Sequence, residues 1–111
     1  MQIFHGHIYF STDQAERATE VRQNLANALP QLTYIGKLIT QPIGPHAKPM
    51  FEIHIPAAEI DRITPVIDDL RQGLPVLIHP VQEDELEAHT AAARWLGEKL
   101  PLDLAVLAKT Q

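Results

Sequence analysis

The sequence predicts an α+β fold in which an antiparallel sheet carries helices on one face. Two observations lead to this prediction. Short β-rich runs alternate with amphipathic segments whose apolar residues recur every three or four positions. Proline or glycine separates most of these segments. The resulting order is βαββαβ with an extra C-terminal helix and an edge strand. This order is that of a ferredoxin-like sandwich, with the strands in the spatial order 4-1-3-2.

The first half of the chain contains two predicted strands and one helix. Residues 3–10 form an apolar run and predict the first strand. Hydroxyl and acidic residues at 11–13 predict a helix start, and apolar residues then recur at helical spacing until Pro30. Residues 32–39 are β-rich with a period near two, which predicts the second strand. Three prolines and a glycine in residues 41–49 predict a loop.

A strand and a helix open the second half. Residues 50–55 predict the third strand, closed by Pro56. The spacing of apolar residues predicts a helix over 58–70, which Pro65 bends or delays and which Gly73 ends.

The remaining residues predict one more strand, one more helix and an edge strand. The nearly all-apolar run 75–80 predicts a buried fourth strand. Acidic residues at 83–85 suit a helix N-terminus and predict a third helix through about Leu96, ended by Gly97. Alternating apolar residues over 100–107 predict the edge strand. Residues 1–111 are expected to form one domain, because the chain is too short for two independent cores.

Composition excludes several classes of function. Nine Lys and Arg residues against fourteen Asp and Glu give a net charge of -5, with no basic cluster, so we expect no nucleic-acid partner. No apolar run approaches the roughly 20 residues of a membrane span, and no signal-peptide pattern opens the sequence. We therefore expect a cytoplasmic protein with no membrane partner. Cysteine is absent, so any metal must be held by His, Asp, Glu or water.

Two histidines one residue apart, His5 and His7, lie within the first predicted strand. Because side chains alternate across a strand, both imidazoles leave the sheet on the face opposite the helices. In a sheet ordered 4-1-3-2 the first strand lies between the third and fourth, so polar residues of those strands come beside the pair. These residues are Glu52, His54 and His79.

This set of side chains fits a metal centre. A nonheme iron site takes two histidines and a carboxylate, whereas zinc takes three or four nitrogen or oxygen ligands. His5, His7 and His79, with Glu52 or His54, satisfy either pattern. The alternative is that the imidazoles are only packed or solvated.

Two further histidines lie outside the predicted strands. We expect His46, in the predicted loop, to lie at the far end of the same sheet near Tyr9. His89 lies in the third predicted helix. Neither spacing distinguishes a functional histidine from a structural one.

The face that carries the histidines also carries apolar residues that a single helical layer would leave exposed. An exposed patch of this kind usually meets a partner, so we expect a homodimer. The residues are Ile3, Tyr9, Met50 and Leu77.

Several short motifs in the sequence resemble those of one family. Residues 5–10 resemble an HxHxYF opening, residues 42–46 a PxGPH loop, residues 50–52 the start of the next strand, and residues 76–80 a VLxHP strand. Residues 84–97 resemble a DxLxxHTxxAxWxG segment. In order and spacing, the chain resembles the small DOPA 4,5-dioxygenase family of fungal and bacterial type.

The resemblance implies a usually dimeric ferredoxin-like domain that opens the ring of a catechol with O2 and a divalent metal, for which Fe(II) is expected and zinc is the alternative. Extradiol cleavage of this kind needs a metal and a nearby base that takes a phenolic proton. The resemblance assigns three histidines, His5, His7 and His79, to the metal. His46 and His89 also match motif positions, and are expected to carry protons or contact substrate across a dimer interface.

The other candidate residues have weaker support from the motifs. Glu52 lies in the family's strand and is a candidate carboxylate ligand, while His54 and Tyr9 are additional candidates. Lys37, Arg22 and Lys48 are the candidates for binding an amino-acid carboxylate, and the sequence places none of them. The alternative function is a non-catalytic, dimeric ferredoxin-like module that binds a metal or a small molecule.

Overall fold

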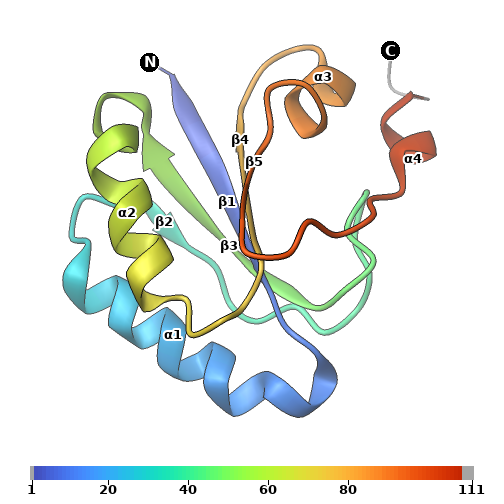
Figure 1. The fold of residues 1–111 in the computed structure, drawn as a ribbon. Helices are drawn as coiled ribbons and strands as arrows, with labels where there is room; N and C mark the ends of the chain where they lie inside the picture. Colours follow the sequence, from blue (N-terminus) through green and yellow to red (C-terminus); the bar gives the residue numbers. More distant parts are fainter. Residues whose placement is uncertain (1, 109–111) are drawn as a thin grey trace.

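The computed structural model describes residues 2–108 and contains a five-stranded antiparallel sheet in the order β2-β3-β1-β4-β5 (Figure 1). The predicted ferredoxin-like βαββαβ arrangement is confirmed, with β1 between β3 and β4. The elements are β1 (Ile3–Tyr9), α1 (Ala15–Ala28), β2 (Tyr34–Ile35), β3 (Met50–Pro56), α2 (Ile60–Leu70), β4 (Val76–Pro80), α3 (Glu85–His89), β5 (Arg94–Leu96) and α4 (Leu104–Ala108). Short 3-10 turns, Thr12–Gln14 and Ala57–Glu59, precede α1 and α2.

Helices α1 and α2 cover one face of the sheet and bury the larger core (Figure 1). The side chains on this face of β1 and β3 alternate as predicted, because successive residues of a strand point to opposite faces. Pro65 lies inside α2 without ending it. The core comprises Ile8, Phe10, Ala18, Val21, Leu25, Leu29, Phe51, Ile53, Ile55, Ile60, Ile63, Ile67, Leu74, Val76 and Ile78.

The second strand is shorter than predicted. Of residues 32–39, only Tyr34 and Ile35 pair regularly with β3, and an isolated bridge joins Ile39 to Met50. Between Ile35 and Ile39 the chain takes one more residue than the opposing stretch of β3, so the ladder is bulged. The side chain of Arg22 on α1 donates hydrogen bonds to the Gly36 and Ile35 carbonyls at 2.7 and 3.1 Å, which satisfies carbonyls at the bulge.

The predicted helix over 83–96 is wrong beyond its first turns. Helix α3 ends at His89, since Thr90 adopts φ -124° and ψ -87°, and residues 94–96 pair with β4 as β5. The unpaired edge of β4 is completed by these residues, and this pairing overrides the helical preference of the alanines before them. The edge strand predicted over 100–107 is also wrong, because that stretch contains α4. Within residues 2–108, no helix has the length and apolar character needed to span a bilayer.

The second face of the sheet is covered as well, by the chain that follows α3 (Figure 1). Trp95, Leu100 and Leu102 pack on this face over Tyr9 and its neighbours. The prediction of an exposed apolar patch is therefore wrong for three of its four residues: Tyr9, Met50 and Leu77 are only 1%, 3% and 0% exposed. The homodimer stays a prediction, without the support of that patch.

Gly6 lies between the two histidines of β1. Unlike them, it faces the side of the sheet that the helices cover. A Cβ atom there would lie 2.8 Å from Cγ1 of Ile53, which is fully buried. Ile53 cannot retreat, so Gly6→Ala should lower the free energy of unfolding by about 1–3 kcal/mol through overpacking. Denaturant unfolding measures the change. In an Ile53→Ala background the same substitution should cost less, and an equal cost in both backgrounds would contradict this reason.

Candidate histidine-rich active site

All six histidines of the chain lie close together on the second face of the sheet. The register of β1 places His5 directly between His54 on β3 and His79 on β4, as predicted. The His5 ring stacks on His54 at 4.1 Å between centroids, and the His7 ring stacks on His79 at 5.1 Å. Sheet register alone therefore gathers the four strand histidines.

The other two histidines arrive from outside the sheet. The loop before β3 places His46 with its ring centroid 4.1 Å from that of His7. Helix α3 places His89 with its centroid 4.0 Å from that of His79. Because α3 ends at His89 and the chain then turns back toward β4, this side chain points at the sheet. His89 is therefore buried, although it belongs to a short helix at the edge of the fold.

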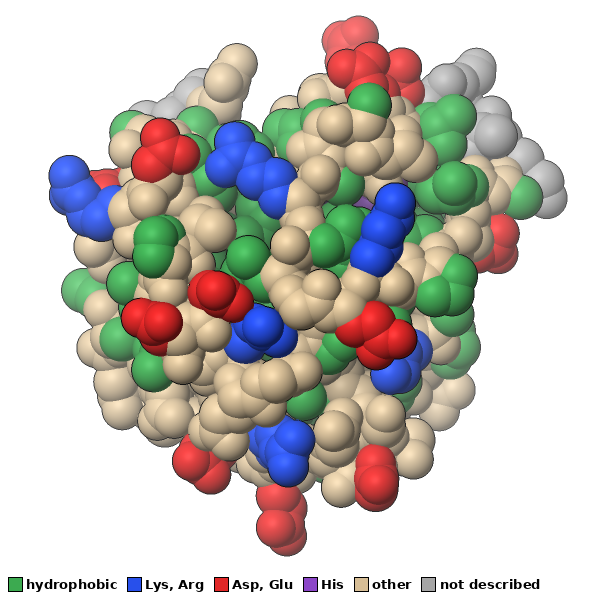
Figure 2. All heavy atoms as spheres, in the orientation of Figure 1, with side chains coloured by type: hydrophobic (Ala, Val, Ile, Leu, Met, Phe, Trp, Pro, Cys, Tyr) green, Lys and Arg blue, Asp and Glu red, His purple; other side chains and the backbone are tan. Residues whose placement is uncertain are grey.

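Four of the six imidazoles are buried. His7, His46, His79 and His89 are 2%, 5%, 5% and 8% exposed. In the space-filling view only a small area of histidine is visible on the face shown (Figure 2). Burying several imidazoles costs desolvation energy unless their nitrogens have partners, so their hydrogen bonds carry information about their role.

Backbone carbonyls determine where the protons lie on two of these rings. His79 Nδ1 lies 2.9 Å from the Pro80 carbonyl oxygen, and His89 Nδ1 lies 2.8 Å from that of Glu85. A carbonyl can only accept, so Nδ1 carries the hydrogen in each ring and Nε2 keeps a free lone pair. This is the arrangement in which metal-binding histidines are normally held.

His7 and His79 approach each other through their Nε2 atoms, which are 3.0 Å apart. In the metal-free protein His7 Nε2 therefore donates to His79 Nε2, which leaves the buried Nδ1 of His7 without a hydrogen-bond partner. Two nitrogens bound to one ion at about 2.1 Å lie about 3.0 Å apart at a right angle and about 3.4 Å apart at the tetrahedral angle, close to the observed separation. The pair thus fits a divalent metal in the place of the shared hydrogen.

Among the described residues, three groups of side chains have donor atoms within 4.8 Å of one another. The first, His5, His7 and His79, is the set that the family resemblance assigned to the metal. A second group shares His7 and adds the two histidines from outside the sheet. The groups are His5, His7 and His79; His7, His46 and His89; and His5, Glu52 and His54.

Glu52 lies between the buried and the more exposed histidines. Its Oε2 is 2.7 Å from His54 Nε2, and its Oε1 is 3.7 Å from the unpartnered His7 Nδ1. A metal on His7 Nε2 would move the ring hydrogen to Nδ1, facing this carboxylate. Carboxylate, histidine and metal in series is a common outer-shell arrangement. The geometry thus favours Glu52 as a partner of His7 over Glu52 as a direct ligand.

Tyr9 fixes the orientation of His46. The buried Tyr9 hydroxyl lies 2.7 Å from His46 Nδ1, the contact between sheet and loop that the sequence predicted. A buried phenol donates its hydrogen where it can, and Nδ1 is the acceptor that lies within reach among the described contacts. His46 then carries its own hydrogen on Nε2, the reverse of His79 and His89.

Burial makes the site sensitive to pH in the metal-free protein. Desolvation, and then the neighbouring imidazoles, lower the pKa of His46 to about 4, and desolvation likewise lowers the pKa of His79 to about 4. The unfolded chain takes up these protons below about pH 6.5, whereas the folded protein takes them up only near pH 4. The free energy of unfolding should therefore fall as the pH falls through this window.

The free energy of unfolding should change by at least about 1.4 kcal/mol per pH unit, the value when the unfolded chain binds one proton more than the folded protein. Urea unfolding of chelator-treated protein between about pH 7 and pH 5 measures this slope. A His46→Gln variant, which lacks one of the two groups, should show a shallower slope. Equal stability of the original protein across the window would contradict the prediction.

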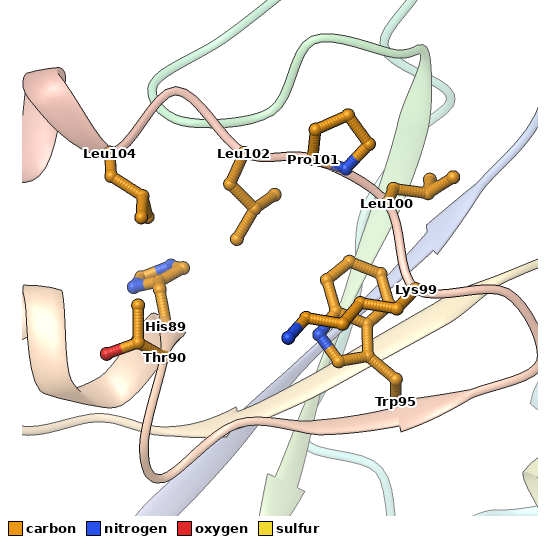
Figure 3. Close-up of a pocket in the computed structure, with 8 residues that line it drawn as sticks. All are labelled: His89, Thr90, Trp95, Lys99, Leu100, Pro101, Leu102 and Leu104. Atoms are coloured by element: carbon orange, nitrogen blue, oxygen red, sulfur yellow. The ribbon is translucent and has the colours of Figure 1, made fainter.

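Two cavities adjoin the histidines. One, of about 230 Å³, is lined by His5, His7, His46, His79 and His89 and by the Glu52 and Glu85 side chains, among others. The second, of about 370 Å³, also has His89 in its wall (Figure 3). Its wall comprises His89, Thr90, Trp95, Lys99, Leu100, Pro101, Leu102 and Leu104.

Sequence reasoning missed most of the second cavity. Trp95 stacks on Tyr9 with 5.9 Å between ring centroids and also lines this cavity. The predicted carboxylate binders do not line either cavity: Arg22 is engaged at the β2 bulge, and Lys99 is the lysine that lines the larger one. No motif marks Lys99, because its position depends on the path of the chain after β5.

Comparisons with known proteins identify relatives of this chain. The chain is 36% identical to an uncharacterized 21.2 kDa protein of Botryotinia fuckeliana, covering 94% of this chain and 62% of that protein. It is 28% identical to a DOPA 4,5-dioxygenase of Amanita muscaria, covering 94% of this chain and 49% of that enzyme. The chain thus spans about half to three fifths of the length of these curated relatives.

The fold has a close counterpart among solved structures. A crystal structure of a "putative dioxygenase" from Nostoc punctiforme matches with a TM-score of 0.90 and 31% identity, covering 100% of this chain and 95% of that one. A sequence profile of the Dopa 4,5-dioxygenase family matches residues 4–106, which include every histidine of the cluster. By this match over nearly its whole described length, the chain belongs to the Dopa 4,5-dioxygenase family.

Proposed function

We propose that this protein is a metal-dependent extradiol dioxygenase that cleaves the ring of a small catechol, such as DOPA, with O2. The observation that supports this function best is the buried contact of 3.0 Å between the Nε2 atoms of His7 and His79. It lies beside two further buried histidines that the metal does not require. Such a site holds both a metal and groups able to move protons.

The proposed ligands are His5, His7 and His79, whose donor atoms lie within 4.8 Å of one another. The Pro80 carbonyl orients His79, and Glu52 faces the outer nitrogen of His7. Fe(II) is the proposed metal and zinc the alternative. When bound, iron supplies Lewis acidity toward the catechol and electrons for the reaction with O2.

The two remaining buried histidines, His46 and His89, have different proposed roles in proton transfer. His89 Nε2 has a free lone pair because Nδ1 is held by the Glu85 carbonyl, so His89 is placed to accept a phenolic proton. His46 carries its hydrogen on Nε2 because Tyr9 occupies Nδ1, so His46 is placed to donate one. Both rings are largely shielded from bulk solvent and lie in the cavity wall, where a ligand would displace water from these atoms.

The proposal is tested by loading the protein anaerobically with Fe(II), adding a catechol and admitting air. Ring cleavage should give a yellow semialdehyde, followed by absorbance and identified by mass spectrometry. Protein with bound metal that gives no product from a panel of catechols would refute the proposal and favour the alternative, a non-catalytic binding module.

A further inference from the structure

The larger cavity has the size and chemistry of a binding site for an aromatic molecule. Its volume of about 370 Å³ lies in the range of about 300–1,000 Å³ that is usual for small-molecule sites. Trp95 and three leucines provide apolar walls, and the side chain of Lys99 extends into the space between them (Figure 3).

Charge is distributed unevenly between the two cavities. Glu52 and Glu85 line the smaller cavity with the histidines. Among the described residues that line the larger cavity, Lys99 carries a permanent charge and no residue is acidic. His89 belongs to both walls, so the cavities meet at the ring that is placed to accept a proton.

We propose that Lys99 determines specificity, by binding a carboxylate on the substituent of an aromatic ligand whose ring reaches the histidines. The substrate class is then a catechol whose side chain carries a carboxylate, as that of DOPA does. A side chain with an ammonium group and no carboxylate would meet apolar walls and Lys99, which repels it, with no carboxylate on the described wall to pair with it. A catechol amine is therefore expected to bind more weakly than the corresponding acid. This inference rests on the proposed function for the position of the catechol ring at the histidines.

The test separates binding from turnover by using a ligand that cannot react. Trp95 is the single tryptophan of the chain and lines this cavity, so its fluorescence reports occupancy directly. We expect 3-phenylpropionate to bind, and 2-phenylethylamine to bind about two- to fivefold more weakly, the effect of one charge pair with the exposed Lys99 side chain. Neither ligand has hydroxyl groups, so neither needs metal or O2.

Three variants identify the lysine responsible. Lys99→Met should abolish the preference for the carboxylate, while Lys99→Arg, which keeps the charge, should retain it. Lys37→Met is the matched control, because Lys37 is exposed and lines neither cavity, and it should also retain the preference. Equal binding of acid and amine to the original protein, or a preference that survives Lys99→Met, would overturn the inference. Binding with this pattern but no catechol turnover would refute the proposed function alone.

Discussion

Replacement of His79 by alanine should abolish tight binding of the divalent metal. His79 Nε2 carries no hydrogen, because the Pro80 carbonyl holds the hydrogen on Nδ1, so its lone pair can pass from the His7 hydrogen, 3.0 Å from donor to acceptor nitrogen, to a metal. Loss of an outer-shell partner alone costs about 10- to 100-fold in metal affinity, so loss of a direct ligand should cost more than about 100-fold. Titration with Fe(II) under anaerobic conditions, or with Co²⁺ as a spectroscopic substitute, measures the affinity.

The matched control is His54→Ala. His54 lies on the same face, on the neighbouring strand, but it is only half-buried. Its Nε2 contacts Glu52 at 2.7 Å, and it belongs to the third group of donor atoms, His5, Glu52 and His54. We expect this variant to keep the tight site. If His54→Ala loses the metal while His79→Ala retains it, the ion binds at His5, Glu52 and His54, and the proposed ligand set is wrong.

Replacement of His89 by glutamine should reduce kcat/KM for a cleaved catechol by about 10²- to 10⁴-fold, the usual contribution of a general base. Glutamine fills much of the same space but cannot accept a proton at the position of Nε2. The metal content should not change, because His89 is outside the proposed ligand set. Steady-state kinetics and elemental analysis of the same preparations measure the two quantities together.

This variant also tests the second grouping of buried histidines. If His89→Gln loses activity and metal together, the ion is held by His7, His46 and His89, whose donor atoms also lie within 4.8 Å of one another. His54→Gln is again the control, since it makes the same chemical change outside the buried cluster. Full activity of His89→Gln would show that another group takes the proton.

Strands β1, β3 and β4 and the faces of their side chains were predictable from the sequence, because side-chain alternation along a strand is a local property of the backbone. The sequence therefore predicts the sheet face on which the His5 and His7 side chains lie, and the strand order predicts that His54 and His79 lie beside them. The contact of Tyr9 with His46 followed from the same reasoning, since the loop before β3 must start at that end of the sheet.

The chain after β4 was not predictable in this way. Ala91, Ala92 and Ala93 favour a helix locally, yet the open edge of β4 recruits residues 94–96 as β5. That pairing is a contact between distant segments, and no periodicity within residues 83–97 encodes it. It ends α3 at His89, covers Tyr9 and Leu77, and directs the chain over the second face.

The sequence by itself determined the fold class, the family and the shared face of the strand histidines, because these depend on side-chain alternation and on short motifs. Only the tertiary structure decided which ring nitrogens are free, since the carbonyls of Pro80 and Glu85 and the hydroxyl of Tyr9 reach them through folding. It also decided that Lys99 lines a cavity beside His89. Hydrogen-bond partners and cavity walls depend on positions in space, and these are set by packing between segments far apart in the chain.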